Sequence, residues 1–335
     1  MKREDLLHAL EIVRPGLASK EMIAQSTSFA FIDDRVVTYN DEISISHPVA
    51  GLGTKMRGAV RAEELYQLLS RIKKDDIVLE QGDKEVTLKA GKAKAGIVME
   101  ARIKLPLDDI SKPDKWKPLP ADFVTGVEFA VPSCAKDTSR PVLMCVNVRK
   151  DGFVEATDNF RITRHKIGEM PVTFLLPAGT ARELVRYPIT KVASGKGWVH
   201  FKTDTDTIFS CRIYQGEFPD ISSILKVVGT EVELPVTMTD VLDRAAVFAQ
   251  QETKDENVTI VLDEGKMTIK GKNPFGWFEE AINMPYEGDG FEFAINPAFL
   301  KTIAGQIRKC VVGKRCLKFT GPTWEHVVAL TAMET

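Results

Sequence analysis

The fold is decided by residues 61–72, which read RAEELYQLLSRI. Leu65, Leu68, Leu69 and Ile72 lie at positions i, i+3, i+4 and i+7, so their side chains fall on one face of a helix. Most of the other positions are charged or polar, which is typical of a helix that packs one face against a core. This segment is therefore predicted to be an amphipathic helix, and similar segments recur along the chain.

Two more helices of this kind are expected. One covers residues 177–187, and the other begins at Asn296-Pro297, where a favoured capping residue precedes proline at the first helical position. The three segments begin at residues 61, 177 and 296, which are 116 and 119 residues apart. Such a regular spacing indicates an internal repeat.

A first amphipathic helix is expected before each of these second helices. The three first helices cover residues 4–13, 121–135 and 238–250, so both steps between their starts are 117 residues long. Two independent landmarks therefore repeat with nearly the same period.

Alternating apolar residues between and after the helices predict strands. In residues 147–156 the alternation brackets Asp151-Gly152, a strong hairpin signal, and residues 258–269 alternate around a turn at 263–265. Further alternating runs follow the second helices, at residues 77–99, 191–214 and 311–333.

Each repeat thus contains helix, strands, helix and strands over roughly 110 residues. Helices on one face of an antiparallel sheet form an α+β layer. The proline-rich residues 109–120 and the shorter connection 226–233 separate the repeats. We therefore predict three similar α+β domains, at residues 1–115, 116–228 and 229–335.

The composition limits the classes of function. The chain has 335 residues, 44% apolar and 27% charged, with a net charge of −2, as is usual for a soluble globular protein. No apolar stretch reaches the length of about eighteen residues that a membrane span needs, and residues 1–13 do not read as a signal peptide. A cytoplasmic protein without a membrane segment is expected. If it meets DNA, its positive charge must be concentrated on one surface.

Signals for catalysis or metal binding are weak. The five cysteines form no CxxC pair, and the five histidines are scattered, so we predict free thiols, no metal, no cofactor and no enzyme activity. The closely spaced Asp204 and Asp206 are expected to lie in a solvated turn. They remain the candidate residues for the alternative of a metal-dependent nucleic-acid enzyme.

Four segments resemble those of one known family, in the same order. Residues 156–162 (Ala-Thr-Asp-Asn-Phe-Arg-Ile) are similar to the Ala-Thr-Asp-Gly-His-Arg-Leu segment of the bacterial DNA polymerase III beta subunit, the DNA sliding clamp. Residues 216–220 resemble its Gly-x-Phe-Pro-Asp segment, residues 243–248 its Arg-Ala-Ala-Ile-Leu stretch, and residues 326–330 its Tyr-Val-Val-Met-Pro tail. The resemblance covers the whole chain but is diffuse in its first third, as in a divergent member.

The resemblance implies a clamp-type α+β fold and a head-to-tail homodimer of two three-domain chains. The dimer would form a ring around duplex DNA without reading its sequence, and would tether a replicative DNA polymerase. An ATP-dependent clamp loader would open the ring. The dimer contact would join Val247 and Phe248 of one chain to the edge strand around Ile97 of the other.

The resemblance also implies a hydrophobic pocket, between the second and third domains, that binds short linear motifs of partner proteins. Thr157 and Arg161 would form its polar rim. Taken singly, these positions are also compatible with ordinary strand residues of a core. Asn159 stands where the family has glycine and Phe160 where it has histidine, so the site is expected to be more apolar than in the family. The pocket would consist of Leu143, Thr157, Asn159, Phe160, Arg161, Ile162, Pro219, Ile224, Val327, Ala329 and Leu330.

Contacts with DNA are expected from basic residues on the helices that line the pore and on nearby loops. A plain alternative exists for Arg71, Lys73 and Lys74, because cations at a helix C-terminus also stabilise the helix dipole. The expected DNA-facing residues are Lys20, Arg71, Lys73, Lys74, Arg140, Arg182, Arg186, Lys301 and Arg308.

A second class of function stays open beside the clamp. The same three domains would serve as an interaction scaffold if the ring did not close, with the pocket still recruiting partners. Solution mass separates these two hypotheses, since the scaffold stays monomeric and the clamp dimerises.

Overall fold

The structure is a computed structural model that describes residues 1–52, 56–110, 113, 115–249, 257–286 and 290–330. The chain divides into two compact units, each built from two separate stretches of sequence. Unit 1 contains Met1–Val124 and Glu169–Gln215, and unit 2 contains Thr125–Gly168 and Gly216–Thr335. Residues 116–228, expected to be one central domain, thus contribute to both units. The three-domain boundaries remain a prediction.

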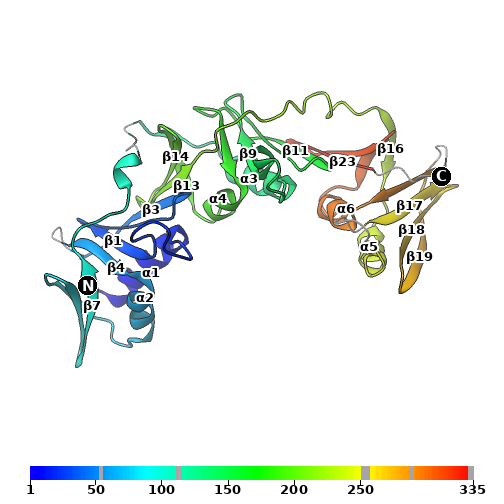
Figure 1. Ribbon diagram of the computed structural model, residues 1–335. Helices are drawn as coiled ribbons and strands as arrows, with labels where there is room; N and C mark the ends of the chain where they lie inside the picture. The colour runs from blue at the N-terminus through cyan, green and yellow to red at the C-terminus, as the bar shows by residue number, and fades with distance from the viewer. Residues whose placement is uncertain (53–55, 111–112, 114, 250–256, 287–289, 331–335) are drawn as a thin grey trace. The chain divides into compact units, whose positions relative to one another are not determined.

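Unit 1 carries three helices on an antiparallel sheet. Helices α1 (Arg3–Val13) and α2 (Ala62–Arg71) pack against each other and against its first strands, as Figure 1 shows, and α4 (Ala178–Leu184) follows the short strand β12 (Phe174–Pro177). The apolar stripe predicted for residues 61–72 is confirmed, because Leu65 and Leu69 are fully buried.

Apart from β12, the described strands of unit 1 form one antiparallel sheet that continues from the first repeat into the second. The pairing of β3 with β15 joins the two repeats and places Ser44 opposite Ser210. In sheet order, the strands are β5 (Val78–Gln81), β6 (Glu85–Ala90), β7 (Ala93–Glu100), β4 (Arg57–Arg61), β1 (Ser28–Ile32), β2 (Arg35–Tyr39), β3 (Ile43–Pro48), β15 (Ile208–Arg212), β14 (Trp198–Thr203), β13 (Ile189–Ser194) and β8 (Lys117–Pro118).

Unit 2 repeats this arrangement. The pairing of β11 with β23 places Ile162 opposite Val327 and joins the second repeat to the third. One run of neighbouring strands is β9 (Cys145–Val148), β10 (Phe153–Thr157), β11 (Arg161–Lys166), β23 (Trp324–Ala329), β22 (Cys316–Thr320), β21 (Lys309–Gly313) and β16 (Gly229–Glu233). A separate sheet has the order β19 (Gly276–Asn283), β18 (Lys266–Asn273), β17 (Val258–Asp263) and β20 (Phe291–Ile295).

The helices of unit 2 lie where the sequence predicts helices, and two of them are shorter than predicted. Helix α3 (Phe123–Ala130) ends earlier than the expected residue 135, because Pro132 interrupts the helical hydrogen bonds and a 3-10 turn follows. Helix α5 (Met238–Ala246) is also shorter than expected, and Gln250, its expected end, lies outside the described residues.

Two local predictions of turns and caps are confirmed. Asn296 caps α6 (Pro297–Ala304), since its side-chain oxygen accepts a hydrogen bond of 2.9 Å from the backbone N–H of Ala298. The hairpin between β9 and β10 turns at Gly152, whose φ of +90° is accessible to glycine at little cost. Six α-helices and antiparallel sheets in the described part of the chain confirm the α+β class.

Candidate functional site

The expected pocket residues all lie in unit 2, where a row of paired residues crosses four neighbouring strands. Thr157 of β10 pairs with Ile162 of β11, Ile162 pairs with Val327 of β23, and Val327 pairs with Lys318 of β22. Ile162 and Val327 are buried and stand side by side on the sheet. The sheet therefore brings together two predicted pocket residues that are 165 positions apart in the sequence.

The connector, residues 216–228, covers this row. Ile221 and Leu225 pack on Ile162 and Val327 in one buried cluster. The Leu225 N–H donates to the Ile221 carbonyl at 3.3 Å, so a single helical turn puts both side chains on the same side. The sequence analysis missed these two residues, although their spacing of i and i+4 was the available signal.

Two cations from the sheet hold the connector in place. The Arg164 guanidinium donates to the hydroxyl of Ser222 at 3.0 Å, and the Lys318 ammonium donates to the carbonyl of Leu225 at 2.7 Å. Both cations also bind carboxylates of the sheet, Glu155 and Glu325 respectively. The connector is thus fixed on both sides of the apolar row.

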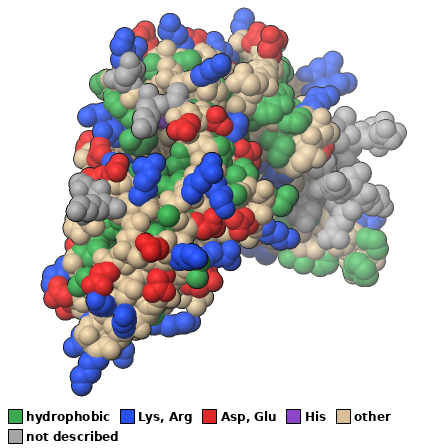
Figure 2. Space-filling view, turned by 60° about the vertical axis from the view of Figure 1, so that its left-hand side comes forward, with side chains coloured by type: hydrophobic (Ala, Val, Ile, Leu, Met, Phe, Trp, Pro, Cys, Tyr) green, Lys and Arg blue, Asp and Glu red, His purple; other side chains and the backbone are tan. Residues whose placement is uncertain are grey.

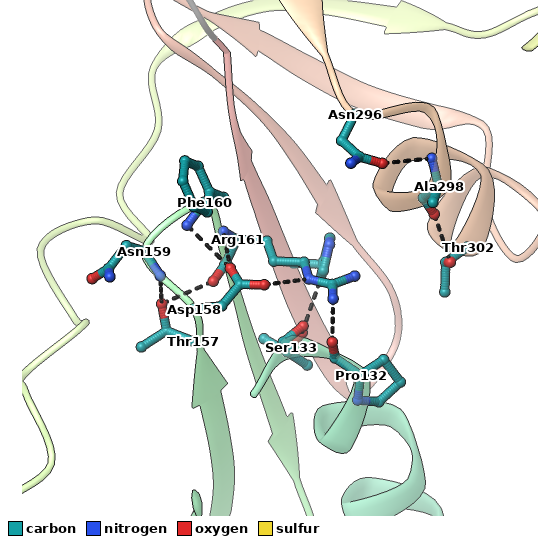
Figure 3. Close-up of polar contacts among 12 residues, drawn as sticks. Pro132, Ser133, Thr157, Asp158, Asn159, Phe160, Arg161, Asn296, Ala298 and Thr302 are labelled. Carbon is teal, nitrogen blue, oxygen red and sulfur yellow. Dashed lines mark hydrogen bonds and ion pairs between the residues drawn. The ribbon is translucent and has the colours of Figure 1, made fainter. Parts of the chain in front are cut away.

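A tight loop at the end of β10 carries the segment that resembles the clamp family (Figure 3). The carboxylate of Asp158 accepts hydrogen bonds from the backbone N–H groups of Phe160 and Arg161, at 3.1 and 3.0 Å. The Thr157 hydroxyl donates to the Arg161 carbonyl at 2.8 Å. Asn159 has a φ of +76°, which asparagine tolerates better than most residues and which fits its place where the family has glycine.

The side chain of Arg161 is engaged within the unit itself. Its guanidinium donates to the Asp158 carboxylate at 3.0 Å and to the carbonyl of Pro132, and it stacks 3.9 Å from the ring centroid of Phe299. Planar stacking combined with forked hydrogen bonding is available to arginine and not to lysine. Arg161 therefore connects the loop to α6.

The predicted pocket residues divide into a buried set and an exposed set. Phe160 and Ile224 are 48% and 52% exposed, and Arg161 is half-buried. Half-buried Phe218 of the connector adds a further apolar group that the sequence analysis did not name. Buried are Leu143, Thr157, Ile162, Val327 and Leu330, and also exposed are Asn159, Pro219 and Ala329.

A row of buried, hydrogen-bonded side chains links the 3-10 turn after α3 to strands β11 and β23. The Ser133 and Thr163 hydroxyls lie 2.7 Å apart, and the Thr163 hydroxyl lies 2.8 Å from Nδ1 of His326. Burial, together with the nearby Arg161 cation, lowers the pKa of His326 to about 3. The imidazole is therefore neutral at physiological pH.

The basic residues expected to face DNA are all exposed. Some of them lie in unit 1 and the others in unit 2. Arg186, Lys301 and Arg308 form ion pairs with neighbouring carboxylates. Within the described residues no ion-pair partner is placed for Lys20, Arg71, Lys73, Lys74 or Arg182. Figure 2 shows that acidic and basic side chains are interspersed over the face that it presents.

The residues expected at a dimer contact differ in exposure. Val247 is 70% exposed and Phe248 is half-buried, whereas Ile97 is buried in its own unit. The neighbouring Val98 is 71% exposed, because successive side chains of a strand point to opposite faces. On β7 the exposed apolar group is therefore Val98.

The structure gives little support to the nuclease alternative. The carboxylate of Asp206 binds Arg35 at 2.6 Å and also Lys202, and these hydrogen bonds lower its pKa, with Lys202 the larger cause. Asp204 accepts a hydrogen bond from Thr190 at 2.8 Å. The part of the chain that the structure describes contains no cluster of three or more metal-ligating side chains and no helix suited to span a membrane.

The repeated helix-and-sheet arrangement, with one repeat joined to the next by strand pairing, is the fold of the bacterial DNA sliding clamps. A sliding clamp of Pseudomonas aeruginosa solved with a ligand matches with a TM-score of 0.87 at 16% identity, covering 99% of both chains. The Bacillus subtilis clamp matches with 0.84 at 16% identity, covering 100% of this chain and 98% of its own. The beta subunit of Thermotoga maritima DNA polymerase III matches with 0.82 at 18% identity, covering 100% and 99%.

These likenesses establish the fold over the whole length of the chain. No family model matches the sequence, and no curated protein matches it. The similarity thus lies in the three-dimensional arrangement rather than in residue identity.

Replacement of His326 by glutamine is expected to weaken the pH dependence of stability. The pKa of His326 is about 3 in the folded state and about 6.5 when unfolded. Between these two pKa values the unfolded state therefore binds more protons at His326 than the folded state does. The stability that the neutral imidazole contributes above pH 6.5 is lost as the pH falls. At pH 5 this loss is about 2 kcal/mol, and His326→Gln should remove it.

The measurement is the free energy of unfolding by urea at pH 7 and pH 5. The exposed His8→Gln variant is the control and should keep the wild-type difference between the two pH values. An unchanged difference in His326→Gln would show that this imidazole is not held neutral by the fold.

Proposed function

We propose that the protein is a DNA sliding clamp, a processivity factor that encircles duplex DNA as a homodimeric ring and tethers a replicative polymerase. The observation that carries this proposal is the clamp fold over 99–100% of the chain, including both strand pairings that join one repeat to the next. Such a protein acts in the cytoplasm as an accessory subunit and performs no catalysis of its own.

The strand pairings support closure into a ring. The third strand after the first helix of one repeat pairs with the last strand of the next, as β3 does with β15 and β11 with β23. By this rule, β19 of the third repeat has no partner strand among the described residues, and it lies at the edge of its sheet. In the described part of the chain, β7, the last strand of the first repeat, is open along most of one side, since it pairs with β4 only through Met99 and Glu100.

A second copy of the chain can satisfy both open edges. Pairing β7 of one copy with β19 of the other continues the sheet and removes two exposed edges in each contact. The contact is heterologous, and two such contacts close a dimer. Exposed apolar side chains lie on or near both edges, namely Val98 on β7, Trp277 on β19 and Val247 after α5.

The low net charge supports sliding along DNA rather than tight binding to it. The net charge is −2, so phosphate attraction must come from local groups such as the exposed cations without ion-pair partners named above. Few phosphate contacts give weak, sequence-independent binding, and the ring supplies retention. Tethering then keeps the polymerase at a high effective concentration near its template.

The exposed apolar groups around the connector support binding of partner peptides. Phe160 and Ile224 are exposed, and half-buried Phe218 packs on the cluster under the connector, so these apolar groups are available to a short hydrophobic motif of a polymerase or clamp loader. Because Arg161 already binds Asp158 and Pro132, its role is to hold the loop that carries Phe160. Recognition of the peptide is therefore mainly apolar.

Replacing Phe160 by serine should reduce the affinity for a Gln-Leu-x-Leu-Phe-type peptide at least tenfold, because an anchoring apolar side chain typically contributes about 2 kcal/mol. Phe160 is half exposed, so the change should leave folding intact. Binding is measured by fluorescence anisotropy of a labelled peptide. Phe275→Ser, at a 94% exposed site of the same unit, is the matched control. Equal affinities for the two variants would reject the site.

Replacing Val98 by aspartate should convert the dimer into folded monomers, because the charge would be buried at the β7–β19 contact without a partner. Val236, 72% exposed against 71% for Val98, provides the matched control Val236→Asp. Mass in solution is measured by sedimentation equilibrium at micromolar concentration. A Val98→Asp dimer as stable as the control would contradict this contact, and a monomeric wild type would favour the scaffold.

A further inference from the structure

The internal repeat predicts how β7 of one copy would align with β19 of another. Strands β3, β11 and β19 are equivalent, because each is the third strand after the first helix of its repeat. The hairpin before each strand closes over the same number of residues, at 40–43, 158–161 and 273–276. Ser44, Ile162 and Trp277, the second residues of the three strands, therefore occupy equivalent positions.

Strands β7 and β15 are equivalent as the last strands of their repeats. Ala59 of β4 and Leu175 of β12 each lie three residues before the first residue of a second helix. Ala59 pairs with Glu100, and Leu175 pairs with Tyr214. Glu100 of β7 and Tyr214, which follows β15, therefore occupy equivalent positions.

These two equivalences give the alignment of β7 with β19. Gly96 and Ser210 each lie four residues before the positions just matched. Ser210 pairs with Ser44, the second residue of β3. The same rule pairs Gly96 of one copy with Trp277, the second residue of β19, of the other copy.

The backbone N–H groups of both strands are compatible with this pairing. Successive N–H groups of a strand point to opposite sides. The N–H of Met99 donates on the β6 side, so that of Gly96, three residues earlier, points to the open edge of β7. The N–H of Met284 donates on the β18 side, so that of Trp277, seven residues earlier, points to the open edge of β19. A slip by one residue would turn these donors away from each other.

Large apolar side chains would be buried in this register. Antiparallel pairing of Gly96 with Trp277 places Val98 opposite Phe275, and these two apolar side chains are 71% and 94% exposed in the single chain. The Trp277 ring would cover the backbone that Gly96 leaves bare. A Cβ built on Gly96 would lie 2.7 Å from a carboxylate oxygen of Glu85, so that carboxylate lies beside the glycine, where it can accept the indole N–H.

The charges of the two edges are complementary. Lys94 of β7 stands opposite Lys89 of β6, and no ion-pair partner is placed for Lys94 in the described part of the chain. Glu279 of β19 contacts one cation of its own chain, Lys270, at 3.5 Å. The register places Glu279 directly opposite Lys94 on the other side of β7. Opposite charges in this position stabilise a strand pair, whereas like charges destabilise it.

Slips of two residues would keep the backbone hydrogen bonds and lose these matches. One slip places Glu279 opposite Gly96, where its carboxylate would meet that of Glu85. The other slip places Val98 opposite Asn273, so Val98 would lose its apolar partner. The side chains thus favour the same register that the repeat predicts independently.

We propose that a second copy of the chain binds in this one register, held at each β7–β19 contact by an ion pair and two apolar contacts. The paired residues are Lys94–Glu279, Gly96–Trp277 and Val98–Phe275. The proposal rests on the proposed function for the existence of the dimer, and it adds the residue pairs that join the two copies. Because the ion pair lies near the surface, salt weakens the contact.

The test is disulfide cross-linking of the full-length protein with pairs of introduced cysteines. Glu279→Cys is combined with Lys94→Cys, which faces it in the proposed register, and separately with Lys92→Cys and Gly96→Cys, which face it after the two slips. Paired residues have Cα atoms about 5.5 Å apart, within the range of a disulfide, whereas a slip of two residues separates them by more than about 7 Å. The Lys94→Cys combination should give at least about tenfold more covalent dimer on a non-reducing gel than either alternative. Glu279→Cys alone is the control for the five native cysteines.

Exchange of the two charges tests the ion pair without cysteines. Lys94→Glu and Glu279→Lys should each raise the dissociation constant of the dimer about tenfold, because a head-to-tail dimer contains two such contacts. The double variant should recover most of that loss. Lys196→Glu, at an exposed turn of the same unit as β7, is the matched control and should leave the constant unchanged. The constants are measured by sedimentation equilibrium.

The outcomes separate this proposal from the proposed function. A dimer that cross-links best through Lys92→Cys or Gly96→Cys, or through none of the combinations, would overturn the register without affecting the proposed function. A double charge exchange that dimerises no more tightly than either single change would overturn the ion pair. A wild type that stays monomeric would overturn the proposed function, and this proposal with it.

Discussion

The interaction on which this structure depends is antiparallel pairing between the third strand after the first helix of one repeat and the last strand of the next. It occurs twice in the chain, as β3 with β15 and as β11 with β23, and each pairing extends a sheet from one repeat into the following one. Backbone hydrogen bonds supply this join whatever the side chains are. A chain with 16% identity to known clamps can therefore keep their fold.

The same join creates the place where peptide binding is proposed. Each pairing brings a row of side chains together across neighbouring strands, and the size of these side chains differs between the two units. Isoleucine and valine in unit 2 pack against the chain's own connector while Phe160 and Ile224 are exposed, whereas the equivalent pair in unit 1 is Ser44 and Ser210. One backbone geometry thus supports two different surfaces.

Much of this architecture was predictable from the sequence, because periodicity and capping are local signals. The apolar stripe of residues 61–72, the Asn296 cap and the turn at Gly152 were all correctly expected. Helix ends were less predictable, since Pro132 stops α3 early. The contacts of Arg161 with Pro132 and Phe299, and the packing of Ile221 on Val327, join residues far apart in sequence, and no local pattern contains that information.

The most direct test of the central claim is electron microscopy of the purified protein in negative stain, with two-dimensional class averages. If an open strand edge at each end of the chain pairs with a second copy, the averages will show closed rings with an open centre. Open arcs or isolated single chains would contradict closure of the ring through β7 and β19. The concentrations are chosen within the range over which sedimentation gives a constant mass.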